Sequence, residues 1–202
     1  MIAILTGDIV NSEQHKPTVW MPVLQYYLST LGATPKDWEI FRGDEFQIKT
    51  TPEKALEVAV HLKALLKSVK GLDVRIGIGL GEETFQGDGV STSNGSAYVH
   101  SGHIFEQLKE KKINLAIASE NEEFNATLNF MFKLALNFMD DWTPVSAEIV
   151  SIVLQQPQAS QIEIAADLKM QQSAVSQRQK RARLDLVWEL LEYYTNAIKK
   201  LA

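Results

Sequence analysis

The chain contains no cysteine in its 202 residues. Disulfide bonds, cysteine-ligated zinc, iron–sulfur clusters and a thiol nucleophile are therefore excluded together. It also has no run near the roughly 18 apolar residues that a membrane-spanning helix needs. The first residues, MIAILTGDIV, lack a basic segment, and their apolar run stops at Asp8, which favours a buried strand over a signal peptide. We therefore expect a soluble, cytoplasmic protein with no membrane partner.

Charge of one sign is not in strong excess, because 25 acidic residues stand against 20 basic ones, a net charge of −5. The chain as a whole is thus not of the basic kind that binds nucleic acid without specificity. The balance differs along the sequence: residues 1–142 carry a net −6 and residues 143–202 a net +1. Such an asymmetry indicates that the two parts have different roles.

The first 118 residues alternate between strand-like and helix-like patterns. We expect strands over Ile2–Val10, Lys36–Arg42, Glu45–Thr50, Asp73–Gly81 and Ile113–Ala118, and helices over Val19–Leu31, from Pro52 onward and over Ala97–Lys109. A two-residue loop, Gly43-Asp44, predicts a hairpin between the second and third strands. The first six elements give the order βαββαβ, which predicts an α+β, ferredoxin-like fold with one antiparallel sheet and helices on one face.

Two details of this pattern make sharper predictions. The first helix has apolar side chains at helical spacing that predict its buried face: Val19, Val23, Tyr26, Tyr27 and Leu31. The segment GIGLG, Gly77 to Gly81, lacks the third glycine of a dinucleotide-binding motif, since Glu82 stands in that place. We therefore interpret these glycines as positions where a helix packs closely on the strand.

A break in the pattern divides the chain near Trp142. A helix is expected over Glu122–Asp141, and Pro144 then biases Thr143 away from helical geometry. Everything from Val145 onward has helical periodicity. We therefore predict two domains, 1–142 and 143–202.

Residues 160–183 have the pattern of a helix-turn-helix. Ser160 and Glu163 form a capping box at the start of a short helix. Its predicted buried face comprises Ile162, Ala165, Ala166 and Leu168. A three-residue turn, Lys169-Met170-Gln171, leads to a second helix that ends near Arg183. Lys169 stands where glycine is usual in this motif, and Gln171 where a helix-capping Ser, Thr or Asp is usual.

The second helix has the composition of a DNA-recognition helix. Side chains that read base edges are Gln172, Ser173, Ser176 and Gln177, and side chains that hold phosphates are Arg178, Lys180, Arg181 and Arg183. We therefore predict DNA as a partner. The alternative is a structural three-helix bundle with a solvated basic face.

A final apolar stripe follows the helix-turn-helix. It comprises Leu184, Val187, Leu191, Tyr194, Ile198 and Leu201. Because it spans fewer than three heptads, packing within the chain is the default interpretation. A homodimer through the same stripe is the alternative, since helix-turn-helix proteins usually read paired half-sites.

Two carboxylates, Asp8 and Asp44, are expected to meet at one end of the sheet. Asp8 lies near the end of the first strand, and Asp44 and Glu45 lie at the hairpin tip, on a strand expected beside the first. Paired carboxylates suit Mg²⁺ or Mn²⁺, which also bind substrate phosphates. In the alternative interpretation, Asp8 pairs with Arg42 or Arg75, or caps a turn.

The segment FRGDEFQI resembles the hairpin of class III nucleotidyl cyclases and the signature of diguanylate cyclases. This resemblance implies that Asp8, Asp44 and Glu45 are the metal ligands. It also implies contacts to a nucleotide ligand from Arg42, Gly43, Asn94 and His103. The sequence departs from the cyclase pattern at several places: Val99 and His103 replace the Asn and Arg that act on the transition state, Ile40 replaces a purine-reading Lys, and Arg42 replaces the first Gly of the diguanylate signature. The resemblance thus implies no catalytic residues.

Over nearly its full length the chain resembles the SatD family. The matching segments include MIAILTGDIVNS, WEIFRGDEFQI, LDVRIGIGLGE, FMDDWTPVSAEIV and SAVSQRQKRA, in that order. The resemblance implies a cyclase-like domain followed by a helix-turn-helix and no particular activity.

Three functions are consistent with these features. The first is a transcriptional regulator whose N-terminal domain senses a nucleotide with a divalent cation. The second is a metal-dependent enzyme of nucleotidyl or phosphoryl transfer. The third is an adaptor protein in which the helix-turn-helix is purely structural.

Overall fold

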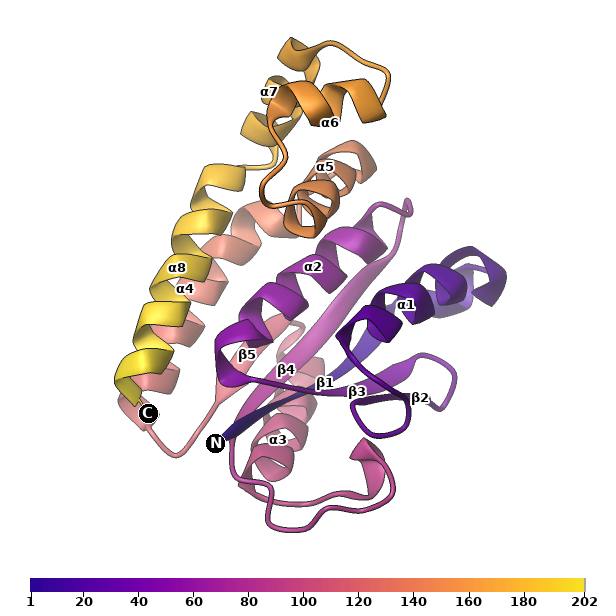
Figure 1. Ribbon diagram of the computed structural model, residues 1–202. Coiled ribbons are helices and arrows are strands. Elements are labelled where there is room, and N and C mark those ends of the chain that lie inside the picture. The colour runs from indigo at the N-terminus through magenta and orange to yellow at the C-terminus, as the bar shows by residue number, and fades with distance from the viewer. Residues whose placement is uncertain (202) are drawn as a thin grey trace.

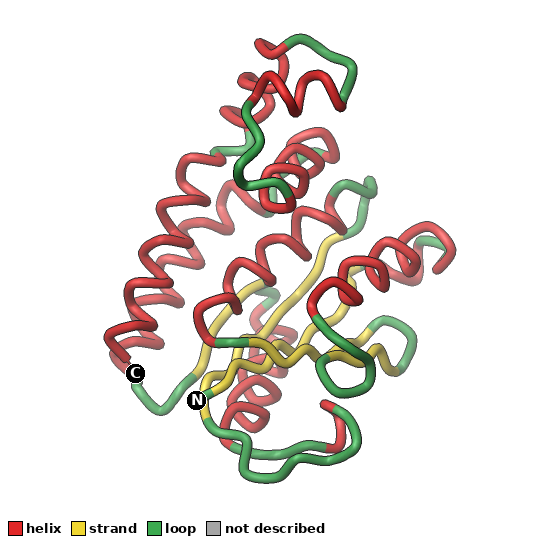
Figure 2. The backbone as a smooth tube through the Cα atoms, in the orientation of Figure 1, coloured by secondary structure: helices red, strands yellow, loops and turns green. Residues whose placement is uncertain are grey.

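The computed structural model describes residues 1–201 and shows an α+β protein (Figures 1 and 2). The described part contains five strands: β1 (Ile2–Val10), β2 (Trp38–Phe41), β3 (Glu45–Thr50), β4 (Asp73–Gly81) and β5 (Leu115–Ala118). Its eight α-helices are α1 (Pro17–Leu31), α2 (Ala55–Lys67), α3 (Ser96–Lys111), α4 (Glu122–Met139), α5 (Pro144–Gln155), α6 (Gln161–Asp167), α7 (Gln172–Arg181) and α8 (Leu184–Leu201). Short 3-10 turns are η1 (Ser12–Gln14), η2 (Pro52–Lys54) and η3 (Val90–Thr92). The α+β class is thus confirmed.

The strands form one mixed sheet in the order β2-β3-β1-β4-β5. The first four strands pair antiparallel, and β5 joins parallel to β4. The crossover through α3 explains the parallel pair, because a parallel partner needs a connection long enough to return to the same end. The central strand β1 is covered on both faces.

The two faces of β1 are covered by different helices, as its side-chain alternation requires. Ala3 and Leu5 belong to the main apolar cluster, which includes α1 and α2. Ile4 packs with Ala97 of α3, and the Thr6 hydroxyl lies 3.0 Å from that of Ser101. Helices α1 and α2 therefore cover one face of the sheet, and α3 covers the other. The prediction of one antiparallel sheet with helices on one face is thus wrong in two respects, because β5 joins parallel to β4 and both faces carry helices.

The glycines of β4 allow α3 to lie against the sheet. A Cβ on Gly79 would overlap the backbone of Ala97 and Ser101, and one on Gly77 would lie 2.9 Å from the amide nitrogen of Phe105. Any side chain at these positions would push the helix away. The interpretation of GIGLG as a close-packing segment is confirmed.

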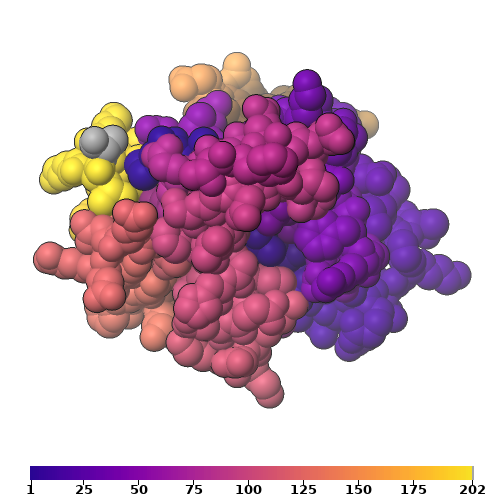
Figure 3. All heavy atoms as spheres, turned by 90° about the horizontal axis from the view of Figure 1, so that it is seen from below, coloured from indigo at the N-terminus to yellow at the C-terminus, as the bar shows by residue number. Residues whose placement is uncertain are grey.

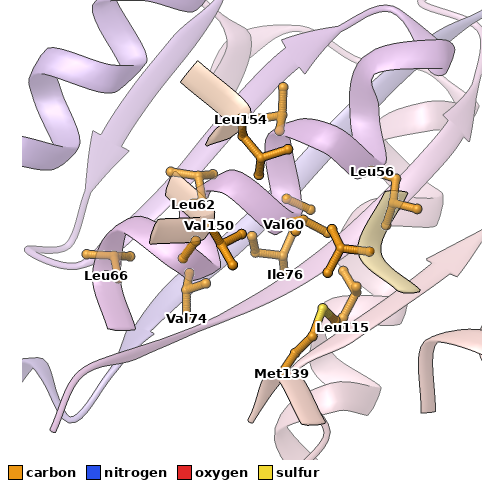
Figure 4. Packing of buried hydrophobic residues seen from close by; sticks show 14 of the residues in the cluster. Leu56, Val60, Leu62, Leu66, Val74, Ile76, Leu115, Met139, Val150 and Leu154 are labelled. Atoms are coloured by element: carbon orange, nitrogen blue, oxygen red, sulfur yellow. The ribbon is translucent and has the colours of Figure 1, made fainter. Parts of the chain in front are cut away.

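Helix α2 is buried on nearly every side, because it lies between the sheet and α5. Val60 and Leu62 are at most 1% exposed. Figure 4 shows side chains of α2 between those of β4, such as Ile76, and those of α5, such as Val150 and Leu154. One apolar cluster thus continues from the sheet into the C-terminal helices.

The C-terminal helices are tied to the rest by buried polar contacts as well. His61 Nε2 of α2 lies 3.1 Å from Ser151 Oγ of α5, and the Tyr194 hydroxyl of α8 donates to the Pro52 carbonyl oxygen at 2.7 Å. The Trp142 indole donates to the Ala182 carbonyl oxygen at 2.9 Å. The break in helical structure lies between α4 and α5, around Trp142 and Thr143, where the sequence predicts it. A separable domain boundary there stays a prediction.

The apolar stripe of α8 is used inside the chain. Leu184, Val187, Leu191, Tyr194 and Ile198 are all buried. In Figure 1, α8 lies along α4, and the two helices are in contact. The side chains therefore follow the intramolecular alternative, and a homodimer, which stays a prediction, would need another surface.

Three local predictions are corrected. Helix α1 buries Trp20, Leu24, Tyr27 and Leu28, whereas Val19, Val23 and Tyr26 are exposed. The hairpin loop has three residues, 42–44, because Phe41 pairs with Glu45, and Arg42 takes left-handed geometry instead of ending the strand. In α6 the buried residues are Ile164 and Ala165, and Ile162 is 71% exposed.

In residues 1–201, no helix combines the length and apolarity needed to span a membrane.

Candidate functional site

Helix α6 begins with the predicted capping box. The Glu163 amide donates to Ser160 Oγ at 3.3 Å, and the Ser160 amide donates to Glu163 Oε2 at 2.8 Å. These bonds satisfy two backbone donors that the first turn of a helix leaves free. The hydrogen bonds from Ser160 hold the pKa of the Glu163 carboxyl below its ordinary value.

The turn after α6 has the geometry at which glycine is usual. Lys169 has φ 51°, in the left-handed region, and the Met170 amide donates to the Ala165 carbonyl oxygen at 2.9 Å. This bond closes the C-terminal end of α6 and directs the chain into α7. Lys169 thus takes the place of the usual glycine at a conformational cost.

Helix α7 is held by few apolar residues. Val175 is fully buried, and so is Ala182, which directly follows the end of α7. The helix contacts α5, α6 and α8. The three-helix arrangement of α5, α6 and α7 is visible in Figure 1, with α6 and α7 forming one end of the molecule. Apart from the half-buried Ala174, the rest of α7 is polar.

The structure leaves most of the predicted DNA-contact residues accessible. Gln172, Ser173, Gln177, Lys180, Arg181 and Arg183 are exposed, and Ser176 is half-buried. Arg178 is the exception: it is half-buried, and its Nη1 lies 3.3 Å from Glu148 Oε2 of α5. Among the described residues, Lys180, Arg181 and Arg183 pair with no carboxylate. Their charges are therefore available to an anionic partner.

The predicted carboxylates do converge at one end of β1. Asp8 is opposite Glu45 of β3 on one side and Arg75 of β4 on the other. Asp44 is next to them, since its carbonyl oxygen accepts from the Ile9 amide at 3.3 Å and its carboxylate accepts from the Ser12 hydroxyl. Figure 3 shows indigo atoms of the first residues in a recess between atoms coloured as α3 and as the β2–β3 hairpin.

Cations neutralise part of this acidic group. Arg75 Nη1 lies 3.6 Å from Asp8 Oδ2, which is the pairing expected in the structural alternative. Lys109 Nζ of α3 lies 3.2 Å from Glu45 Oε1, and Arg42 Nη1 lies 3.6 Å from Glu45 Oε2. Asp8 and Asp44 are therefore the carboxylates with unused oxygen positions, whereas Glu45 is held by two cations.

The pKa values show how burial and charge act on this group. Burial raises the pKa of the Asp8 carboxyl, Arg75 and Lys109 oppose that rise, and Asp44 and Glu45 add to it. Burial acts to lower the pKa of Lys109, but Glu45 and Glu106 raise it above its ordinary value. Within the described part, Asp8 Oδ1 and Arg75 Nε are buried without a hydrogen-bond partner. Such unsatisfied atoms are costly and fit a site completed by a ligand.

The other predicted ligand contacts do not all lie here. Arg42 and Gly43 form the hairpin tip, with φ 51° and 93°. Asn94 belongs to the loop that follows β4, where it pairs with Phe85, and this loop begins opposite Ile2. Ile2 and Asp8 are six strand residues apart, about 20 Å. His103 is exposed on α3, and its Nε2 lies 3.2 Å from Gln107 Nε2. The structure therefore brings Arg42 and Gly43, but not Asn94, to the carboxylates.

Sequence reasoning missed several residues of both sites. Lys109 reaches Glu45 because α3 crosses the sheet from the start of β1 toward its end, which no local pattern reveals. In residues 1–201, no three His, Cys, Asp or Glu side chains come together closely enough to hold a metal ion. Asp8, Asp44 and Glu45 thus lie at the same end of the sheet, but their side chains do not form a three-carboxylate metal site. At the other site, the missed residues are Gln161 and Gln179, whose amides contact each other across α6 and α7. Their polarity alone carries no signal of a partner.

Comparisons with known proteins give one result. No curated protein and no solved structure matches the chain. The family model described as SatD family matches residues 1–192, nearly the whole length. The chain therefore belongs to the SatD family.

Proposed function

We propose that the protein is a transcriptional regulator that binds double-stranded DNA through α6 and α7. The observation that supports this most is the accessible surface of α7 and of Arg183 just after it, where three cations without carboxylate partners adjoin four polar side chains. A helix-turn-helix places the N-terminal residues of its second helix against base edges, and phosphate contacts fix its orientation. Gln172, Ser173, Ser176 and Gln177 are the base-reading candidates, and Lys180, Arg181 and Arg183 the phosphate contacts. Arg178 joins them only after leaving Glu148.

The net charge of the chain does not oppose this proposal, because the cations are local. Arg178, Lys180, Arg181 and Arg183 lie within six residues that contain no carboxylate. Because only a few cations contact phosphates, removing one or two of them changes the salt dependence of the binding constant measurably. Each neutralised phosphate adds about 0.9 to the slope of log K against log salt.

The test compares two double variants of equal charge change. We expect Lys180→Ala with Arg181→Ala to weaken binding to every duplex and to lower the salt slope by about 2. Lys199→Ala with Lys200→Ala, at the far end of the 18-residue α8, is the control and leaves the slope unchanged. Fluorescence anisotropy of a labelled duplex measures both. Equal slopes for the two double variants, or no affinity of the wild type at low salt, would refute the proposal.

Within this proposal, residues 1–142 form a ferredoxin-like, cyclase-like sensing domain and residues 143–202 a helix-turn-helix domain. The supporting observation is that β2, β3, β1 and β4 follow one another with antiparallel pairing and place Asp8 beside the hairpin tip. We propose that Asp8 and Asp44 hold Mg²⁺ or Mn²⁺ together with the phosphates of a nucleotide. Two carboxylates leave coordination positions open, and phosphate oxygens suit them. Arg42 and Gly43, at the hairpin tip next to Asp44, are proposed to contact the same phosphates.

Thermal unfolding tests the sensing site. A nucleoside triphosphate with Mg²⁺ raises the melting temperature of the wild type by mass action, more than Mg²⁺ alone does. Asp8→Asn keeps the shape, loses the charge and abolishes the metal-dependent part of the shift. Glu120→Gln, an exposed carboxylate between β5 and α4, is the matched control and keeps it. No shift with any nucleotide and metal would leave Asp8 and Asp44 as structural carboxylates.

No conversion to a cyclic nucleotide is expected, because Val99 and His103 are exposed on α3 and neither matches the residue of the cyclase pattern. A cyclic product that depends on Asp44 would instead favour the enzyme.

Paired half-sites favour a homodimer on DNA. Sedimentation with and without a duplex measures that state.

A further inference from the structure

Three glutamine amides form a hydrogen-bonded row between α6 and α7. Gln172 Nε2 donates to Gln161 Oε1 at 2.5 Å, and Gln161 Nε2 donates to Gln179 Oε1 at 2.6 Å. Gln161 is the first residue of α6, and Gln172 is the first residue of α7. Gln161 thus connects the beginning of α6 to the first and the last turn of α7. It also holds the side chain of Gln172 at the exposed N-terminal end of α7.

The fold keeps both ends of this row in place. The capping box at Ser160 fixes the backbone immediately before Gln161. Val175, one turn after Gln172, is fully buried and fixes the first turn of α7 against its neighbours. The row therefore joins two backbone segments that are each anchored, so the Gln172 amide has one preferred orientation.

Gln172 keeps the atoms that read a base. Its side chain is exposed, and among the described residues nothing bonds to its Oε1 or to the second hydrogen of its Nε2. A carboxamide with a free oxygen and a free N–H complements adenine, because it donates to N7 and accepts from the N6 amino group. No other base presents that donor–acceptor pair in the major groove.

Gln177 provides the contrast. It is equally exposed, but its side chain makes no hydrogen bond with any residue in 1–201. Ordering a free glutamine on binding costs conformational entropy, whereas Gln172 is already ordered. The two glutamines thus differ in preorganisation and not in chemistry.

We infer that Gln172 reads an adenine in the major groove and that Gln161 is the positioning residue that orients it. This inference rests on the proposed function and adds a base preference and the residue that enforces it. Gln179 anchors the Gln161 amide by accepting from its Nε2. The base preference at the position facing Gln172 is then stronger than at the position facing Gln177.

Selection from a random-sequence duplex library tests the inference with the full chain. The wild type enriches sites with an adenine at one fixed position in each half-site. Gln172→Ala loses that preference, a change of about 5- to 150-fold in the ratio of affinities for adenine and the other bases. Gln172→Glu moves the preference to cytosine, since a carboxylate accepts from the cytosine N4 amino group.

Variants of Gln161 separate positioning from mere stability. Gln161→Ala lowers the adenine preference by about 2- to 10-fold, because Gln172 must then be ordered on binding. Gln161→Glu still accepts from Gln172 and keeps the preference, although its charge weakens binding to all duplexes. Gln177→Ala leaves the adenine position unchanged. The melting temperature of each variant confirms folding.

The outcomes distinguish this inference from the proposed function. If Gln172→Ala binds DNA and enriches the same sequences as the wild type, the inference is wrong and the DNA-binding proposal stands. If Gln161→Ala retains the full adenine preference, Gln161 has no positioning role. If the wild type enriches no sequence and binds no duplex, both are refuted.

Discussion

Lys63 of α2 offers a sharp test of how the sheet is joined to the end of α4. Its ammonium group is buried, with 3% of the side chain exposed, and it lies 2.8 Å from Asp73 Oδ1 and 2.6 Å from Asp140 Oδ1. Asp73 begins β4, and Asp140 directly follows α4. Lys63→Met keeps most of the volume of the side chain and removes the charge that joins these elements.

The expected loss of stability follows from what each carboxylate keeps. Removing one partner of a buried ion pair typically costs about 3–5 kcal/mol. Asp73 retains Lys67 at 3.2 Å and accepts from the Val74 amide at 2.8 Å, and Asp140 is 42% exposed and so remains hydrated. We therefore expect a loss at or just below the lower limit of that range, about 2–3 kcal/mol.

Urea unfolding followed by circular dichroism measures this loss at pH 7. The midpoint falls while the dependence of the unfolding free energy on urea stays constant, because the exposed surface of the unfolded chain is unchanged. Asp140→Asn is the control and costs less than about 1 kcal/mol, since its carboxylate is partly in water. A loss below about 0.5 kcal/mol for Lys63→Met, or an equal loss for the control, would refute the reasoning.

Three further predictions concern stability. Burial lowers the pKa of His61 to about 4 from 6.5. Between these two pH values the unfolded chain binds a proton at His61 and the folded chain does not. The free energy of unfolding therefore falls by roughly 3 kcal/mol as the pH drops from about 6.5 to 4. His61→Gln removes that part of the pH dependence in unfolding titrations, and an unchanged slope would contradict it. Gly79→Ala lowers the stability by about 1–3 kcal/mol because its Cβ would overlap the backbone of α3. Gly102→Ala is the control: its Cβ meets nothing within 4 Å, so it stabilises α3 by up to about 1 kcal/mol. Melting temperatures of the two variants that move in the same direction would contradict this packing explanation. Tyr194→Phe removes one of the two donors to the Pro52 carbonyl oxygen and leaves the Ala55 amide as the other. It therefore costs about 1 kcal/mol in urea unfolding; no measurable loss would show that this bond adds nothing.

The elements of the fold were predictable where local signals agree. The strand at Ile2–Val10, the capping box at Ser160 and the break before Pro144 follow from alternation, capping and the restriction before proline. The glycines of β4 were also predictable, because alternate glycines in a buried strand leave room for a helix. Each of these depends on residues near one another in the sequence.

The buried faces of helices were less predictable. Helix α1 has two apolar stripes, one with Trp20 and Leu24 and one with Val19 and Val23, and periodicity alone does not choose between them. The position of the sheet does choose, because Trp20 and Leu24 face β1 and α2. In α6, Ile162 and Ile164 cannot share one face, and only contact with α7 determines which is buried.

The candidate sites were predictable in part. Strand adjacency brings Asp8, Asp44 and Glu45 together, as the sequence indicates. The cations on them were harder to foresee, since Lys109 arrives from a helix that follows 64 residues after Glu45. Gln161 was equally hidden, because its role depends on a hydrogen bond across the turn and not on its type.

Genome-wide mapping of the protein's DNA contacts in cells tests the central claim most directly. The full chain is expected to be enriched at discrete sites, and this enrichment is lost when Lys180 and Arg181 are both replaced by alanine. The pair of substitutions at Lys199 and Lys200 leaves the map unchanged. Absence of discrete enrichment for the wild type, at the same expression level, would contradict the assignment of α7 as a DNA-recognition helix.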